Sequence, residues 1–361
     1  CSIVVVSFNN LVFTRLCLES VLFNTSEPAF ELIVVDNGSA DGSREYLQAL
    51  SRLHENVRIQ LNDANLGFAR ACNQGLSLAR NELLVLLNND TIVAPGWLVG
   101  LQRGLKAPNV GLAGPVTNRC GNEAEVNVSY QTYGGMLNYA KQRASDYAGQ
   151  TVNLRMLAMF CVAFTRQVYE QVGKLDESFG LGLFEDEDYS MRLTRAGYSL
   201  VCMEDVWVHH FGQASFGKLA ASGEYGDIFH ANRRRFEVKW GVRWQPHARR
   251  TSGDYRQLVS EIRTLVESRT PFQSIVLVAS KGDEDLVAFT GRTGWHLPQE
   301  KDGTYSGHHP ANGREVIDAV EDVRLKGAEV FVLPASMFWW LQFYPDLATH
   351  LAERYRLLVD D

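Results

Sequence analysis

Four consecutive acidic residues, Glu185 to Asp188, open a predicted helix in the stretch FEDEDYSMRLTRAGYSL (184–200). Acidic side chains favour a helix N-terminus because they meet its positive dipole end and its free amide groups. Capping needs fewer carboxylates than four, and crowded carboxylates repel one another, which raises the pKa of at least one of them. A crowded, partly buried carboxylate is suited to act as a general base. The run therefore predicts either a helix cap or a proton acceptor.

Two adjacent histidines, His209 and His210, follow in the stretch VWVHHFGQASF (206–216). Adjacent side chains of a strand point to opposite faces, so one of the two faces any given site. A single histidine in such a run is more often structural than functional. Together with Asp90 and Asp188, however, it would supply the oxygen and nitrogen ligands that suit Mn²⁺ or Mg²⁺.

Asp36 ends an apolar run and begins the turn-forming stretch DNGSADGS (36–43). A local Asx or glycine turn explains this pattern. A carboxylate that accepts hydrogen bonds from a nucleotide base or ribose explains it equally well. The glycine pattern of dinucleotide-binding proteins does not follow the first apolar run, where SFNNLVF (7–13) stands instead, and a Walker A loop is also absent from the sequence. These two kinds of nucleotide site are therefore disfavoured.

The elements that must position these residues alternate in type along the N-terminal part of the chain. Apolar runs typical of strands buried on both faces occupy residues 2–8, 31–37, 57–62 and 82–90. Helical patterns lie between them, at residues 11–23, 43–53 and 68–78. This alternation predicts an α/β fold with a doubly wound, mostly parallel sheet.

Every one of these four predicted strands ends on polar or glycine-containing residues. The four exits are Ser7-Phe8-Asn9, Asp36-Asn37-Gly38-Ser39, Asn65-Leu66-Gly67 and Asn88-Asn89-Asp90. Ligands of open α/β sheets bind beyond the carboxyl ends of the strands. The sequence therefore predicts a site along this edge of the sheet.

A second α/β pattern starts at residue 270, where we place a domain boundary. Strands are expected at 274–280, 330–335 and 356–361, with a helix at 314–326 and a tryptophan-rich helix around Trp339. The charged segment before it is expected to be mostly helical, with the basic run Arg233–Arg235 on a solvated face. The predicted domains are thus 1–216, a helical extension 217–270, and a smaller α/β domain 271–361.

Bulk properties exclude several classes of protein. The chain has 361 residues, 45% of them hydrophobic and 21% charged, which is ordinary for a globular protein. Its net charge of −7 argues against nucleic-acid binding. The six cysteines include no CxxC pair, which is typical of reduced thiols in a cytoplasmic protein. We also expect the chain to be part of a longer polypeptide with further domains.

Taken together, the motifs resemble those of glycosyltransferase family 2, the inverting enzymes with the GT-A fold, a Rossmann-like α/β fold. The resemblance covers about residues 1–240 and is strongest to rhamnosyltransferase-like enzymes of bacterial polysaccharide synthesis. It rests on seven stretches in the expected order: VVVSFNN, IVVDNGSADGS, NDANLGFARACNQG, LLNNDTIVAPGWL, CVAFTRQVYEQVGKLDESF, FEDEDYSMRLTRAGY and VHHFGQASF.

The resemblance assigns roles to particular residues. Asp36 matches the residue that contacts the nucleotide base. The remaining lining of the donor pocket is expected from Ser7, Phe8, Asn9, Asn65, Gly67, Asn88 and Asn89. The family's metal motif, usually Asp-x-Asp, is here Asn88-Asn89-Asp90, so Asp90 would be its one charged ligand. His210 fits the ligand histidine better than His209 because His210-x-Gly212 has the family spacing. Asp188 completes the expected metal set.

The resemblance also implies a reaction. Asp186, next to Glu185, matches the general base that activates an acceptor hydroxyl. Trp97 is a weaker candidate for stacking on an acceptor sugar. The implied activity is Mn²⁺- or Mg²⁺-dependent, inverting transfer of a sugar from a nucleotide-diphosphate sugar to a glycan or lipid-linked acceptor. Such an enzyme would work in the cytoplasm, including the inner face of the membrane.

Two other functions stay open at this point. One is a non-catalytic module that binds sugar nucleotides or glycans within a larger protein. The other is a nucleotidyltransferase, although the glycine-rich basic loop of such enzymes does not follow the first strand. The sequence does not distinguish UDP, dTDP and GDP donors, since an aspartate accepts hydrogen bonds from each of these bases.

Overall fold

The computed structural model of the chain describes residues 1–212, 224–247 and 253–359. It divides into two compact units. The first comprises Cys1–Gly217 and His230–Arg243, and the second comprises Lys218–Phe229 and Trp244–Asp361. The predicted boundary at 216–217 falls outside the described residues. The predicted helical extension divides between the units, because its segment 230–243 belongs to the first unit and its end belongs to the second.

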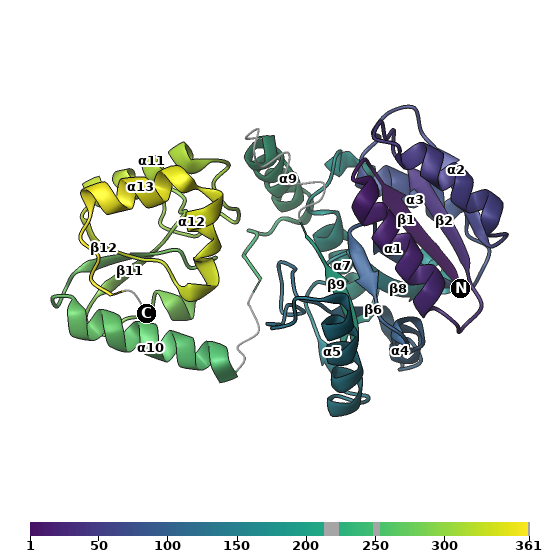
Figure 1. Cartoon of the computed structure of the whole chain (residues 1–361), viewed down its shortest axis with the longest axis horizontal. Helices are drawn as coiled ribbons and strands as arrows, with labels where there is room; N and C mark the ends of the chain where they lie inside the picture. Colours follow the sequence, from purple (N-terminus) through teal and green to yellow (C-terminus); the bar gives the residue numbers. More distant parts are fainter. Residues whose placement is uncertain (213–223, 248–252, 360–361) are drawn as a thin grey trace. The chain divides into compact units, whose positions relative to one another are not determined.

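The first unit is built on one sheet with helices on both faces, as Figure 1 shows. Its strands are β1 (Ser2–Ser7), β2 (Glu31–Asp36), β3 (Val57–Leu61), β4 (Leu83–Asn88), β5 (Thr91–Val93), β6 (Val110–Val116), β7 (Thr151–Asn153), β8 (Cys161–Thr165) and β9 (Ser199–His210). Its helices are α1 (Leu11–Asn24), α2 (Ser43–Leu53), α3 (Phe68–Leu78), α4 (Trp97–Gly104), α5 (Tyr133–Asp146), α6 (Arg166–Val172), η1 (Glu177–Phe179) and α7 (Glu185–Arg195). The helix α9 (Glu224–Trp240) enters this unit at His230.

The sheet has the strand order β3-β2-β1-β4-β8-β6-β9-β5, and β7 pairs with β9. Neighbours from β3 to β4 are parallel, whereas β8 runs antiparallel to β4 and β6. The predicted α/β class and the first four strands are therefore confirmed, and the sheet is mixed beyond β4. Helices α1, α2 and α4 contribute to the core on one face, and α3, α5, α6 and α7 to the core on the other. This double cover explains the unbroken apolar runs Ile3–Val6 in β1 and Leu83–Leu87 in β4.

The second unit has a three-layer arrangement of its own. Its elements are α10 (Gly253–Arg269), β10 (Ile275–Val278), η2 (Glu284–Leu286), β11 (Thr293–His296), α11 (Gly313–Leu325), β12 (Ala328–Val332), η3 (Ala335–Met337), α12 (Trp339–Phe343) and α13 (Pro345–Arg354). The parallel sheet β11-β10-β12 lies between α10 on one face and α11 and α13 on the other (Figure 1).

One expectation for this unit was wrong, and one strand was missed. The strand expected at 356–361 does not form over its described residues 356–359. The strand β11, with the sequence TGWH, went unnoticed because it holds a glycine and a single large apolar side chain. Among the described residues, none of the helices combines the length and the apolar character needed to cross a membrane.

Candidate active site

Two turns, at the carboxyl ends of β2 and β3, are tied together by Asn37. Its Nδ2 donates to Asn65 Oδ1 at 2.8 Å and to the Gly67 carbonyl at 3.2 Å, while its Oδ1 accepts from the Leu66 amide at 3.0 Å. Asn37 was not singled out from the sequence, although it directly follows Asp36 in the same turn. The structure therefore adds it as the residue that fixes the predicted turn Asn65–Gly67 against the end of β2.

Asp36 is fully buried at the end of β2. Its Oδ2 accepts a hydrogen bond from the Ser39 amide at 3.1 Å and lies 3.9 Å from Arg44 Nε. Its Oδ1 is shielded from solvent and has no hydrogen-bond partner among the described residues. A buried carboxylate oxygen without a donor is costly. It is therefore suited to accept a hydrogen bond from a ligand.

The exit of β1 is held against the same turn. The Asn9 amide donates to Ser39 Oγ at 2.7 Å, and Asn9 Oδ1 accepts from the Ala40 amide at 2.9 Å. Asn9 and Asn10 both have left-handed backbone angles, with φ of 53° and 61°. Asparagine tolerates this conformation better than most residues. Phe8 is half-buried beside them, so the predicted lining Phe8–Asn9 lies at this edge.

Two residues predicted to line the donor pocket are engaged inside the protein instead. The fully buried Ser7 places its Oγ 3.2 Å from Thr14 Oγ1, and Asn89 Nδ2 donates to the same Thr14 oxygen at 2.9 Å. Their side chains therefore join β1 and β4 to α1. Asn88 differs, because its Oδ1 is shielded from solvent and has no hydrogen-bond partner in the described part of the chain.

Asp90 and His210 form a close pair, with Asp90 Oδ1 3.2 Å from His210 Nε2. The short ladder of β5 with β9 brings them together, since Thr91 pairs with His210 and the Phe211 amide donates to the Asp90 carbonyl at 2.9 Å. His210 Nδ1 lies 2.7 Å from the Arg119 carbonyl, which only accepts hydrogen bonds. Nδ1 is therefore protonated, and in the neutral ring the Nε2 lone pair faces the carboxylate. A cation bound by both atoms would accept the lone pair of Nε2 and offset the negative charge of the carboxylate.

The other histidine faces away from this pair. His209 Nδ1 lies 2.7 Å from the Tyr130 hydroxyl, and the ring packs edge-on against Phe211. Burial, and secondly the neighbouring His210, lower the pKa of His209 to about 4. His209 is therefore a neutral residue of the packed interior, and His210 is the histidine that faces Asp90.

Asp188 is not part of the Asp90–His210 pair. Its buried carboxylate accepts from Arg192 Nε at 2.9 Å and Trp240 Nε1 at 2.9 Å, and Lys239 Nζ lies 2.6 Å away. These contacts occupy both of its oxygens. The prediction that Asp188 is a metal ligand is therefore wrong. In the part of the chain that the structure describes, no three His, Cys, Asp or Glu side chains are grouped so that they could hold a metal ion.

Trp97 is a core residue. It is 2% exposed, and its Nε1 donates to Thr25 Oγ1 at 2.9 Å. Its ring packs in the apolar layer between the sheet and helices α1 and α4. The prediction that Trp97 stacks on an acceptor sugar is therefore wrong, because both faces of the ring are covered by protein.

The acidic run lies where helix α7 begins, after a segment of unusual backbone geometry. Leu183 and Phe184 both have φ of 75°, a left-handed conformation that is strained for bulky residues. Such strain persists only where the surrounding structure imposes it, and it is common at functional sites. Asp186 is half-buried, and its Oδ1 accepts from the Glu187 amide at 2.9 Å.

Glu185, by contrast, is buried, and its Oε2 has no hydrogen-bond partner among the described residues. Burial, and secondly the charge of Asp186, raise the pKa of Glu185 to about 8. Glu185 is therefore protonated at neutral pH, and Asp186 is the more accessible carboxylate of the two. Burial, and secondly the charge that Glu185 carries once it is ionised, raise the pKa of Cys72 in α3, so α7 begins close to that helix.

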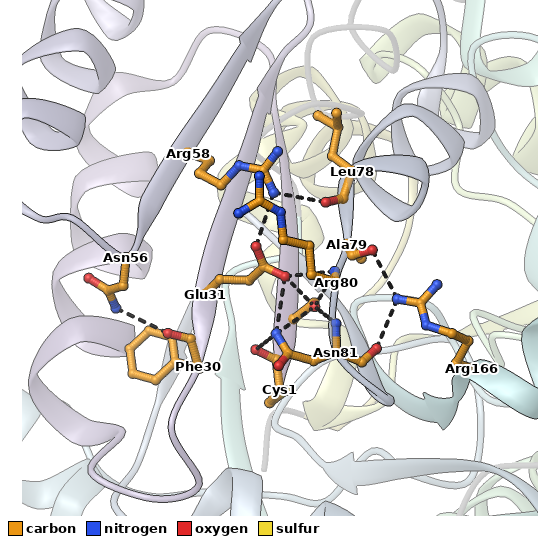
Figure 2. Close-up of polar contacts among 11 residues, drawn as sticks. Cys1, Phe30, Glu31, Asn56, Arg58, Leu78, Ala79, Arg80, Asn81 and Arg166 are labelled. Atoms are coloured by element: carbon orange, nitrogen blue, oxygen red, sulfur yellow. Dashed lines mark hydrogen bonds and ion pairs between the residues drawn. The ribbon is translucent and has the colours of Figure 1, made fainter.

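The opposite edge of the sheet shows what a purely structural polar cluster looks like in this protein. Figure 2 shows Glu31 at the start of β2, where its carboxylate accepts from Ser2 Oγ at 2.8 Å, the Arg80 amide at 2.8 Å, Asn81 Nδ2 at 3.1 Å and Arg58 at 3.1 Å. Both carboxylate oxygens are satisfied by the protein. At the carboxyl edge, one side-chain oxygen of each of Asp36, Asn88 and Glu185 has no hydrogen-bond partner among the described residues.

The raised pKa of Glu185 predicts how stability depends on pH. Between its ordinary value of 4.5 and about 8, the unfolded chain has released this proton and the folded protein keeps it, so stability falls as the pH rises. Glu185→Gln removes this titration. We expect the variant to gain stability relative to wild type from about pH 5 to about pH 8, by up to about 1.4 kcal/mol per pH unit. Urea denaturation at several pH values measures the difference.

The control for this experiment is Glu45→Gln, which changes an exposed glutamate in the first turn of α2. Its stability should follow that of wild type at every pH. Parallel curves for Glu185→Gln and wild type would show that Glu185 titrates normally in the folded protein.

Comparison with known proteins relates this part of the chain to a protein family. Residues 2–173 match the model of Glycosyl transferase family 2. This segment of the first unit is a glycosyltransferase family 2 domain. The matched segment holds the strand exits and Asp90, whereas Asp186 and His210 follow it in the chain.

Similar curated proteins include several glycosyltransferases. The chain is 27% identical over 220 residues to the glycosyltransferase AglE of Haloferax volcanii, covering 60% of this chain and 68% of AglE. It is 26% identical over 251 residues to the O-antigen biosynthesis protein RfbC of Myxococcus xanthus, covering 66% and 20%. An uncharacterised protein of Sinorhizobium fredii, y4gI, is 26% identical over 225 residues, covering 60% and 25%. The chain thus spans a quarter or less of the length of two of these relatives.

Solved structures with some likeness include a mannosyltransferase of Pyrobaculum calidifontis in complex with GDP-Man and Mn²⁺. It has a TM-score of 0.47 and 18% identity, covering 64% of each chain.

Proposed function

We propose that the chain is an inverting glycosyltransferase that moves a sugar from a nucleotide-diphosphate sugar to a hydroxyl of a glycan or lipid-linked acceptor, in bacterial surface polysaccharide synthesis. The observation that carries this proposal is a set of three shielded oxygens, on Asp36, Asn88 and Glu185, that have no hydrogen-bond partner among the described residues. Asp36 and Asn88 lie within the segment that matches family 2, and Glu185 follows it. They lie where strands β2 and β4 and helix α7 meet the ligand-binding edge of the sheet.

The donor nucleotide would lie across the ends of β2, β1 and β4. Asp36 pairs with Ser7 in the sheet register, and Asn88 pairs with Val6 on the other side of β1. Two strand spacings therefore separate Asp36 from Asn88, roughly 10 Å, a span suited to a nucleoside whose base contacts Asp36. Asp36 Oδ1 can accept a hydrogen bond from a ring N–H of uracil, thymine or guanine. UDP, dTDP and GDP donors therefore all fit.

The donor set of Asp90 and His210 fits a divalent ion. A ligand histidine usually donates its other ring N–H to a carbonyl or carboxylate, as His210 does to Arg119. Mg²⁺ and similar ions often take one or two protein ligands and complete their shell with water and substrate phosphates. Mn²⁺ or Mg²⁺ held by these two residues would neutralise the charge that develops on the departing diphosphate.

Asp186 would accept the proton of the acceptor hydroxyl while that oxygen forms the new bond to the anomeric carbon. The bond from this carbon to the diphosphate oxygen breaks on the opposite face, and the diphosphate leaves with the electron pair. A single displacement of this kind inverts the anomeric configuration. The protonated Glu185 lowers the negative charge beside Asp186, which favours an approaching nucleotide diphosphate.

A thermal-shift panel tests the proposal most directly. Wild type, Asp36→Ala and Asp90→Ala are melted with UDP, dTDP, GDP and NAD, each with and without Mn²⁺. A ligand at 100 times its dissociation constant stabilises by roughly 2.7 kcal/mol, which such a melt detects. We expect one nucleoside diphosphate to stabilise wild type in the presence of Mn²⁺, with the gain lost in both variants.

The matched control is Asp63→Ala, which removes an exposed carboxylate from the turn after β3. It should retain the nucleotide-dependent gain of wild type. A panel without any nucleotide shift in wild type would overturn the proposal. Stabilisation by one nucleotide without sugar transfer to any acceptor would favour a non-catalytic sugar-nucleotide-binding module.

A further inference from the structure

Residues 179–184 (FGLGLF), here called the strap, lead directly into the acidic start of α7. Four of these residues have positive φ angles: 66° at Gly180, 148° at Gly182, and 75° at Leu183 and Phe184. Two of the four are bulky residues for which this conformation is unfavourable. The strap therefore depends on contacts from outside itself to keep the conformation that places Glu185 and Asp186.

One side of the strap rests on the turn that leads from β3 into α3. The Phe68 amide donates to the Leu181 carbonyl at 3.3 Å. Gly67 lies so close that a Cβ built on it would be 2.0 Å from the Gly180 carbonyl oxygen. With φ of 88°, Gly67 also has a conformation that other residues rarely adopt. The turn expected to line the donor pocket is thus in direct contact with the segment that carries the candidate base.

The other side of the strap is held by one side chain of α9. Asn232 is buried, and its Nδ2 donates to the carbonyls of Phe179 at 2.8 Å, Gly182 at 2.8 Å and Leu183 at 3.2 Å. Arg235 donates to its Oδ1 and so orients the amide. The basic run Arg233–Arg235 was expected to be a solvated face; Arg234 and Arg235 are exposed, and Arg235 makes this specific contact as well.

We propose that Asn232 is the positioning residue for the general base of this domain. By holding three carbonyls of the strap, it fixes the start of α7 against the turn at Gly67 and so places Asp186 relative to the bound donor. Asn232 itself does not touch the reacting atoms. This inference rests on the proposed function, and it assigns part of the site to a helix that lies beyond the matched segment 2–173.

The test compares Asn232→Ala with Asn73→Ala. Asn73 is a matched control because it is also buried and also makes three hydrogen bonds, to the Leu175 carbonyl, the Leu175 amide and Glu177 Oε1, at 2.9–3.0 Å. Its partners precede the strap. Both variants are studied well below their melting temperatures by amide hydrogen exchange of residues 179–188 and by steady-state kinetics with the donor that the thermal-shift panel identifies.

For Asn232→Ala we expect faster exchange in the strap, a kcat at least tenfold below wild type and a donor KM within twofold. Asn73→Ala should keep the exchange of the strap and a kcat within twofold. A merely structural role would lower the melting temperatures of both variants without separating their kcat values. Unchanged strap exchange or unchanged kcat in Asn232→Ala would overturn the inference.

Failure of the proposed function would look different. In that case wild type transfers no sugar from any of the donors. Amide hydrogen exchange of residues 179–188 then decides alone whether Asn232 holds the strap. Faster strap exchange in Asn232→Ala supports the positioning contact even then, and unchanged exchange overturns it.

Discussion

Replacing Asp186 with asparagine is expected to lower the rate of sugar transfer by roughly 10²–10⁴-fold, the usual contribution of a general base. Asparagine has nearly the same shape as aspartate but does not accept the acceptor proton. Asp186 is half-buried at the start of α7, next to the more buried Glu185. Donor binding depends on the strand exits, so the nucleotide-dependent thermal shift should stay close to that of wild type.

A chemical rescue separates the base from a general disturbance of the site. Azide is already an anion and has no proton to lose, so it needs no base when it attacks the anomeric carbon. Asp186→Asn should therefore form glycosyl azide at a rate close to that of wild type, with inverted configuration. Full transfer to the natural hydroxyl acceptor in this variant would remove Asp186 from the mechanism and direct attention to Glu185.

The largest loss of stability is expected for Asp188→Ala. The Asp188 carboxylate is fully buried between Arg192, Lys239 and Trp240, and the alanine variant leaves two cationic groups facing an emptied site. Removing one member of a buried ion pair typically costs about 3–5 kcal/mol. Since Arg192 and Lys239 are partly exposed, we expect about 3 kcal/mol, measured as the free energy of unfolding in urea.

Asp176→Ala provides the comparison, because Asp176 contacts the same Lys239 nitrogen at 2.6 Å from a more exposed position. Exposed ion pairs contribute less than about 1 kcal/mol. Mn²⁺ affinity, measured by calorimetry on the folded proteins, should be the same for wild type and both variants. A stable Asp188→Ala protein with weakened Mn²⁺ binding would restore Asp188 to the metal site.

The local elements of the first unit were predictable because each apolar run or helical pattern is complete within a few residues. Helix α2 was predicted as 43–53 and forms Ser43–Leu53, with Leu47 and Leu50 buried. Helix α3 likewise matches its predicted bounds. Strand β11 escaped prediction because its sequence, TGWH, holds a glycine and a single large apolar side chain.

The site itself was predictable only in part. Its position along the sheet edge followed from the strand exits, and the spacing His210-x-Gly212 selected the histidine that faces Asp90. The orientation of Asp188 was not visible, because two of its three partners, the ammonium of Lys239 and the indole N–H of Trp240, come about fifty residues later in the chain. Trp97 was misassigned for a similar reason, since its partner Thr25 lies far away in sequence.

Because α9 follows the other elements of the first unit in the chain, it also affects when this unit can fold during synthesis and how long a truncated fragment must be. During synthesis, residues 1–212 leave the ribosome before Lys239 and Trp240, so Asp188 meets only one of its three partners until α9 has emerged. A fragment that ends at Gly212 would contain every candidate site residue named from the sequence. It would nevertheless lack two of the three partners of Asp188, Lys239 and Trp240, and the amide of Asn232 that holds the strap. We therefore expect a fragment that folds as the first unit to extend to residue 243, where that unit ends.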